Sequence, residues 1–102
     1  MQRLSITPLV DAFTSGASDP SAFLDDLYER IAVLGVRPIW ISLLPRERAQ
    51  ELLHSALARR ARGESLPLLG VPFAIKDNID LAGAPTTAAC PEFAYTPATS
   101  AT

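Results

Sequence analysis

The chain changes character near residue 63, and this change constrains its fold more than any other feature of the sequence. Before this point, apolar residues recur with the period of amphipathic helices. After it the helical period disappears, and prolines recur at positions 67, 72, 85, 91 and 97. We therefore expect a mainly helical part over residues 1–65 and a part of different structure over residues 66–102.

Two helices are predicted in the first 35 residues. Thr7-Pro8 favours a helix start, because a threonine hydroxyl caps free backbone N–H groups and proline has its φ preset. That helix is short and ends at Gly16. Ser18-Asp19-Pro20 repeats the start signal, and Gly35 closes the run that follows. An amphipathic helix is predicted over 20–34, since apolar residues recur at helical spacing: Phe23, Leu24, Leu27, Ile31 and Leu34.

A third helix is predicted from Pro45 to about Arg62. Its last turn is rich in arginine, and cations there complement the negative end of the helix dipole. Its inward face consists of Ala49, Leu52, Leu53, Ala56 and Leu57. Residues 38–44, which precede this helix, are rich in β-branched and aromatic residues and are bounded by prolines. We expect a strand there, with Trp40 in the core.

A second strand is predicted beyond residue 63. Residues 68–75 are almost continuously apolar and give way abruptly to Lys76-Asp77-Asn78, which is typical of a buried strand that ends at a polar site. The predicted order α-α-β-α-β favours an α/β fold whose sheet has barely begun. The length of 102 residues suits one small domain. We expect Val71–Ile75 to be poorly covered.

The composition excludes several classes of function. The net charge is −2 and the basic residues form no stripe, so nucleic-acid binding is not expected. No apolar run approaches the about twenty residues that a membrane span needs, so no membrane association is expected. The single cysteine, Cys90, cannot form an intramolecular disulfide and fits a reducing compartment. We expect a cytoplasmic protein without a metal or cofactor.

Lys76 is the first candidate for chemistry, because it is the only lysine in a chain whose other basic side chains are arginines. Burying an ammonium group at a strand end is costly, so either an acid pairs with it or the amine gives up its proton. An uncharged amine is a general base. From the residues alone, a surface lysine paired with Asp77 or Asp80 is the more common case.

The other reactive side chains are interpreted structurally. A catalytic Cys90 would need a histidine base, but the only histidine, His54, falls in mid-helix among solvent-facing positions. We therefore expect Cys90 to be a small buried apolar residue and His54 to be an ordinary helix residue. Asp77 and Asp80 could form an acid/base pair, but a turn after the strand explains them, with Gly83 at a positive φ.

A resemblance to a known family rests on residues 69–80, which read Leu-Gly-Val-Pro-Phe-Ala-Ile-Lys-Asp-Asn-Ile-Asp, with Gly83 and Thr86-Thr87 after them. This pattern resembles the lysine-bearing strand and loop of the amidase signature family. Within that family, residues 86–97 and 38–41 are similar to allophanate hydrolases. The resemblance is strong over residues 66–100 and looser before them.

The resemblance implies that residues 1–102 are the N-terminal part of a single amidase domain, with the first strands of its mixed sheet. It also implies a Ser–cis-Ser–Lys triad in which Lys76 is the lysine. Lys76 would take the nucleophile's proton through a bridging serine and then protonate the leaving amine. Thr86 and Thr87 match the family's threonine pair near the site, and we expect them, with Asp77, to be structural hydrogen-bonding residues.

The family's Gly/Ser-rich segment, which holds both serines, is expected beyond residue 102, since neither Ser65 nor Ser100 has such a context. The resemblance therefore implies that these residues alone are inactive. It implies a longer parent that hydrolyses a small amide, with allophanate in urea breakdown as the first candidate, and related enzymes are often homodimers. A general amidase or the amidase-like component of an amidotransferase is an alternative, and so is a truncated, non-catalytic product.

Overall fold

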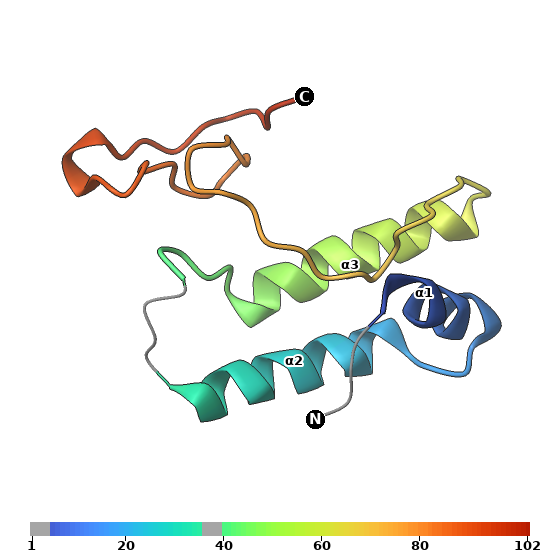
Figure 1. The fold of residues 1–102 in the computed structure, drawn as a ribbon. Helices are drawn as coiled ribbons and strands as arrows, with labels where there is room; N and C mark the ends of the chain where they lie inside the picture. Colours follow the sequence, from blue (N-terminus) through green and yellow to red (C-terminus); the bar gives the residue numbers. More distant parts are fainter. Residues whose placement is uncertain (1–4, 36–39) are drawn as a thin grey trace. The chain divides into compact units, whose positions relative to one another are not determined.

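The computed structural model describes residues 5–35 and 40–102. In these residues the chain forms three α-helices, α1 (Ile6–Ser15), α2 (Pro20–Leu34) and α3 (Arg46–Ala61), and one short 3-10 helix, η1 (Pro91–Phe93) (Figure 1). None of the described helices is long and apolar enough to cross a membrane. The chain divides into two compact units: a helical unit of Met1–Gly35 with Pro45–Pro72, and a loop unit of Val36–Leu44 with Phe73–Thr102.

The two ends of α2 are set by local sequence, as predicted. The Asp19 carboxylate caps the helix by accepting a hydrogen bond from the Ser21 N–H at 3.0 Å, and Pro20 follows as a first-turn residue. The helix stops where Gly35 adopts a φ of +71°, a conformation that glycine reaches without steric cost. The predicted range 20–34 is confirmed.

The starts of the other two helices lie close to their predicted positions. Helix α1 begins at Ile6, so the prediction that Thr7 caps it is wrong. Ser5 occupies the capping position, and its side chain makes no cap hydrogen bond to a described residue. Helix α3 begins at Arg46, directly after Pro45, and ends one residue before Arg62.

The core of the helical unit is small. Phe13, Leu53 and Leu69 are buried, with exposed fractions of 3%, 8% and 8%. The ring of Phe13 packs edge-on against that of Phe23, with centroids 5.6 Å apart. Gly70 lies against the same ring, since a β-carbon at this position would come within 2.9 Å of two Phe13 ring carbons. Close approach, together with a φ of +84°, requires glycine here.

The predicted inward faces are wrong at two positions. Leu34 in α2 is 55% exposed and Leu52 in α3 is 46% exposed. Leu53, the neighbour of Leu52, is the α3 residue that reaches the core. The physical reason is the size of the core, which is too small to cover the whole apolar stripe of either helix.

Polar side chains join α2 to α3. Gln50 accepts a hydrogen bond from the Ser21 hydroxyl at 2.9 Å and donates to the Ser21 carbonyl at 3.1 Å and to Asp25 at 3.0 Å. One turn earlier in α3, Arg46 donates to Asp25 at 2.8 Å and to Glu29 at 3.1 Å. Arg46 lowers the pKa of Asp25 through this bond. The contacts advance along α2 as they go back along α3, so the two helices are antiparallel.

The loop unit contains no strand in its described residues, 40–44 and 73–102. The pairing found there is an isolated antiparallel bridge between Thr86 and Tyr95, with N···O distances of 2.8 and 3.1 Å. The chain turns back through η1 to form it (Figure 1). Thr86 is buried, with an exposed fraction of 2%, so the bridge is the best-covered part of this unit.

Both predicted strands are therefore wrong for the described residues. Residues 68–75 form a turn followed by an irregular segment. Residues 38–39 lie outside the described part, residues 40–44 are not a strand, and Trp40 is 45% exposed rather than in the core. An apolar run becomes a strand only where another strand satisfies its backbone groups, and the described residues offer none. The sheet of the expected α/β fold stays a prediction.

Poor cover of Val71–Ile75 is confirmed in its second half. Phe73 is 80% exposed and Ile75 is 36% exposed. Val71 itself is half-buried. Large apolar side chains at the solvent boundary of this segment are the consequence of its missing strand partner.

Candidate active site

Lys76 follows the irregular apolar segment, and its side chain is exposed. The prediction of a lysine at a buried strand end is therefore wrong for the described residues. The Lys76 carbonyl accepts a hydrogen bond from the Ile79 N–H at 2.9 Å, which closes the predicted turn over Asp77 and Asn78. Every ion pair within residues 5–35 and 40–102 is made by an arginine, so the expected pairing of Lys76 with Asp77 or Asp80 is absent there.

The Asp77 carboxylate holds the loop at residues 87–89. One of its oxygens accepts a hydrogen bond from the Thr87 N–H at 3.2 Å. The other oxygen accepts from the Thr87 hydroxyl and from the Ala89 N–H at 3.2 Å. The Asp77 carbonyl accepts from the Ala88 N–H, also at 3.2 Å. One aspartate therefore binds three consecutive residues that lie ten or more positions further along the chain.

These donors stabilise the ionised form of Asp77. They lower its pKa, with the Thr87 hydroxyl as the main cause and the backbone N–H groups of residues 87–89 adding to it. The same contacts fix a strained turn. Ala88 and Ala89 have φ values of +49° and +60°, in the left-handed region, where each alanine costs about 1–2 kcal/mol. Such a conformation persists where surrounding contacts impose it, and Asp77 supplies those contacts.

Asp80 and Tyr95 form a second set of contacts around the buried Thr86. The Thr86 hydroxyl donates to an Asp80 oxygen at 3.0 Å, and the Tyr95 hydroxyl donates to the same oxygen at 2.5 Å. The bond to Asp80 raises the pKa of Tyr95. The ring of Phe93 packs edge-on against that of Tyr95, with centroids 5.8 Å apart. The predicted structural role of Thr86 and Thr87 has its geometric basis in these bonds to Asp80 and Asp77.

Tyr95 is a residue of this cluster that the sequence reasoning misses. The available signal is a pair of short β-prone stretches, Thr86-Thr87 and Tyr95-Thr96, on either side of Pro91. Such a pair indicates that the chain returns on itself and brings position 95 back to position 86.

The last residues of the loop unit brace the turn at Gly83. Gly83 has the predicted positive φ, +79°, and its N–H donates to the Pro97 carbonyl at 3.0 Å. The Ser100 hydroxyl accepts a hydrogen bond from the Ala82 N–H at 2.9 Å. Ser100 thus has a structural contact, in agreement with its exclusion as a nucleophile.

Cys90 is exposed, so the prediction that it is buried is wrong. It lies at the start of η1, where its Sγ donates to the Glu92 carboxylate at 3.3 Å. A residue that opens a short surface helix faces solvent whatever its apolar character. Among residues 5–35 and 40–102, no group of three or more His, Cys, Asp or Glu side chains is arranged to hold a metal ion.

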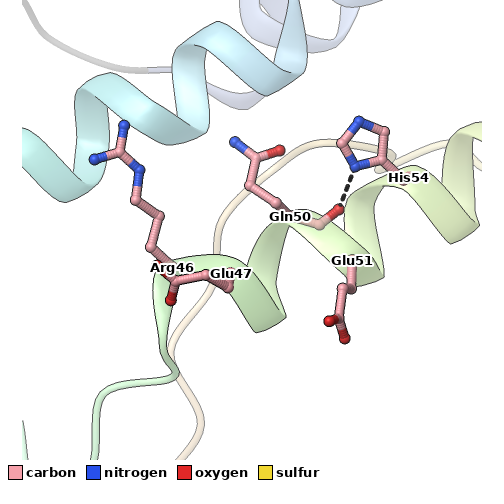
Figure 2. Close-up of a pocket in the computed structure, with 5 residues that line it drawn as sticks. All are labelled: Arg46, Glu47, Gln50, Glu51 and His54. Atoms are coloured by element: carbon pink, nitrogen blue, oxygen red, sulfur yellow. Dashed lines mark hydrogen bonds between the residues drawn. The ribbon is translucent and has the colours of Figure 1, made fainter.

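His54 is an exposed residue of α3, as predicted, with its Nδ1 2.8 Å from the Gln50 carbonyl oxygen. It borders an open surface hollow of about 630 Å³ whose lining comes entirely from α3: Arg46, Glu47, Gln50, Glu51 and His54. Figure 2 shows that the Glu51 side chain points away from those of Gln50 and His54. These groups do not converge on one point, so the hollow lacks the geometry of a catalytic site.

The chain belongs to the amidase family, whose model, described as "Amidase", matches residues 30–102. The matched part includes Lys76, Asp77 and the Thr86-Thr87 pair. This agrees with the resemblance to the amidase signature family found in the sequence.

Particular relatives narrow the comparison. The chain is 47% identical over 96 residues to a urea amidolyase of Saccharomyces cerevisiae, which covers 91% of this chain and 5% of that protein. It is 49% identical over 67 residues to a urea amidolyase of Lachancea kluyveri, which covers 64% of this chain and 4% of that protein. It is also 36% identical over 85 residues to a glutamyl-tRNA(Gln) amidotransferase subunit of Deinococcus deserti, with 83% and 17% covered. The chain spans a small part of each relative.

Proposed function

We propose that Lys76 is the base of an amide hydrolase that uses a Ser–cis-Ser–Lys triad. The observation that supports this role is its position: it is the only lysine of the chain, directly follows Gly-Val-Pro-Phe-Ala-Ile, and lies within the part that matches the amidase family. It also makes no ion pair with a described residue. An amine without an acidic partner gives up its proton more readily than one in an ion pair, and a general base requires this.

In this mechanism a serine hydroxyl attacks the amide carbonyl while its proton passes through a bridging serine to the Lys76 amine. The ammonium then returns a proton to the leaving nitrogen as the C–N bond breaks. Water hydrolyses the remaining acyl-enzyme by the same route in reverse. Both serines come from residues outside the 102, so the chain by itself does not turn over an amide.

Allophanate is the substrate we propose. The support is the 47% identity, over most of this chain, to a protein named urea amidolyase. Allophanate is a urea that carries a carboxylate, so its hydrolysis is the cleavage of an amide-type C–N bond. The loop residues Asp77, Thr86 and Thr87 have a structural part in this proposal, which is to hold the chain that follows Lys76.

The test is a Lys76→Ala change in the full-length gene product. We expect turnover of allophanate to fall about 10³-fold, because general base catalysis is lost, while the thermal unfolding midpoint stays near that of the wild type. Lys76→Arg keeps the positive charge but cannot deprotonate, so it is expected to be equally inactive. Arg48→Ala, which removes an exposed cation paired with Glu51 on α3, is the control and should retain activity. Turnover that survives in Lys76→Ala contradicts the proposal.

A second candidate is the ammonia-producing component of an amidotransferase. It is favoured by identities of 36% and 40% to glutamyl-tRNA(Gln) amidotransferase subunits of Deinococcus deserti and Chlamydia felis. Ammonia release by the full-length gene product separates the two. Release from allophanate but not from glutamine supports the first proposal, and release from glutamine alone supports the second.

A further inference from the structure

The acidic side chains of the loop unit are all hydrogen-bonded by neutral donors. Asp77 accepts from residues 87–89, Asp80 from the hydroxyls of Thr86 and Tyr95, and Glu92 from the thiol of Cys90. These residues and Lys76 are the titratable side chains of residues 40–44 and 73–102. Lys76 is the one cation among them, and it is paired with none of the acids.

Asp77 matters most to Lys76, because the two residues are adjacent in the chain. Its carboxylate is engaged at both oxygens, and its carbonyl is engaged by the Ala88 N–H. Both its side chain and its backbone are therefore held on the 87–89 loop. The Thr87 hydroxyl is the strongest of these donors, since it is the main cause of the lowered pKa of Asp77.

We propose that Asp77 and Thr87 are positioning residues for the base: the Thr87 hydroxyl holds the Asp77 carboxylate on the loop and so prevents it from pairing with the Lys76 amine. This inference rests on the proposed role of Lys76 as the base. A carboxylate released beside the amine would favour the charged ammonium, which cannot accept a proton. Hydrogen bonds from neutral donors satisfy the carboxylate without adding a competing cation.

Asp80 provides an internal comparison. It accepts from two hydroxyls, those of Thr86 and Tyr95, so the loss of one leaves the other in place. Thr86→Val and Thr87→Val remove the same hydroxyl from neighbouring threonines, both in contact with an aspartate. Only the second frees the carboxylate that is adjacent to Lys76.

The experiment measures kcat and KM for allophanate against pH in the full-length gene product. For Thr87→Val we expect the midpoint of the acid limb of the kcat profile to move up by about one pH unit, with KM little changed above it. Thr87→Ser keeps the hydroxyl and should restore the wild-type midpoint. Thr86→Val should leave the midpoint in place. Asp77→Asn added to Thr87→Val removes the freed charge and should cancel the shift.

Three results would overturn the inference. One is a Thr87→Val enzyme that is slower at every pH with an unmoved midpoint, which is what a merely structural role produces. The second is an equal shift in Thr86→Val, and the third is a shift that persists after Asp77→Asn. If Thr87→Val fails to fold, as judged by a missing thermal transition, Thr87→Ala deletes the same hydroxyl without added bulk and takes its place.

Failure of this inference differs from failure of the proposed function. Turnover that survives in Lys76→Ala rejects the role of the lysine and, with it, the positioning role. Loss of turnover in Lys76→Ala together with an unmoved Thr87→Val midpoint rejects the positioning role alone.

Discussion

Neighbouring threonines in the loop unit bind different carboxylates. The Thr86 hydroxyl donates to Asp80 and the Thr87 hydroxyl donates to Asp77. Successive side chains of an extended backbone point to opposite faces, so a pair of threonines can serve two acids on different sides of the segment. Thr86 is the buried member of the pair, with its backbone bridged to Tyr95. Each threonine therefore has a separate residue-level role despite identical chemistry.

The loop contacts of Asp77 are expected to depend on pH. Its pKa is lowered in the folded chain, chiefly by the Thr87 hydroxyl. A carboxylate with a depressed folded pKa contributes stability above its unfolded pKa, near 4, and loses it as the pH falls through the folded pKa. We expect the amide NMR signals of Thr87 and Ala89 to hold steady from neutral pH down to about pH 4 and to shift below it.

The control for this prediction is Asp77→Asn, which has no carboxyl group to titrate. Its Thr87 and Ala89 signals should show no acid transition in the same range. A transition of equal size in the variant would assign it to another acid, and signals that change well above pH 5 would contradict the lowered pKa of Asp77.

The sequence can single out Lys76 because the argument for it is compositional and local: one lysine, placed directly after an apolar run. The contacts of Asp77 with Thr87 and of Asp80 with Tyr95 join residues ten and fifteen positions apart. No periodicity encodes such contacts, so from the sequence both aspartates read as turn residues. That interpretation is correct for their backbone and misses what their side chains hold.

At the level of elements, the helices are predictable from the sequence and the strands are not. The start and stop of α2 depend on Asp19, Pro20 and Gly35, all within the helix or next to it. A strand depends on a partner elsewhere in the chain, because its N–H and C=O groups are satisfied only by pairing. Residues 71–75 have the composition of a buried strand but no described partner, so they stay irregular.

The capping of α2 gives an element-scale prediction. Asp19→Ala removes the acceptor of the Ser21 N–H and leaves a helix-end donor without its partner. We expect the free energy of unfolding to fall by about 1 kcal/mol. Urea unfolding followed by circular dichroism at the helix band measures this loss.

The matched control lies at the start of α1. Ser5 occupies the same capping position there, but its side chain makes no cap hydrogen bond to a described residue. Ser5→Ala should therefore change the free energy of unfolding by less than about 0.5 kcal/mol. Equal losses in the two variants would show that the cap hydrogen bond of Asp19 is not the source of the effect.

At the scale of the whole molecule, burial is distributed unevenly between the two units. The buried apolar side chains of the described residues, Phe13, Leu53 and Leu69, all belong to the helical unit. In the loop unit the buried side chain is polar, that of Thr86, while Phe73 is 80% exposed. Apolar burial is the main source of folding free energy, whereas a hydrogen bond has a modest net effect. The two units therefore differ in what stabilises them.

Amide hydrogen exchange of the 102-residue chain should reveal this difference. Local opening free energy follows apolar burial, so we expect backbone amides in the middle of α2 and α3 to exchange about tenfold or more slowly than the bridge amides of Thr86 and Tyr95. Both sets are hydrogen-bonded, so a difference between them reports opening of the unit rather than the absence of a bond. Equal protection of the two sets would contradict the expectation, because it would require the loop unit to open only together with the helices, held by apolar contacts that its described residues do not contain.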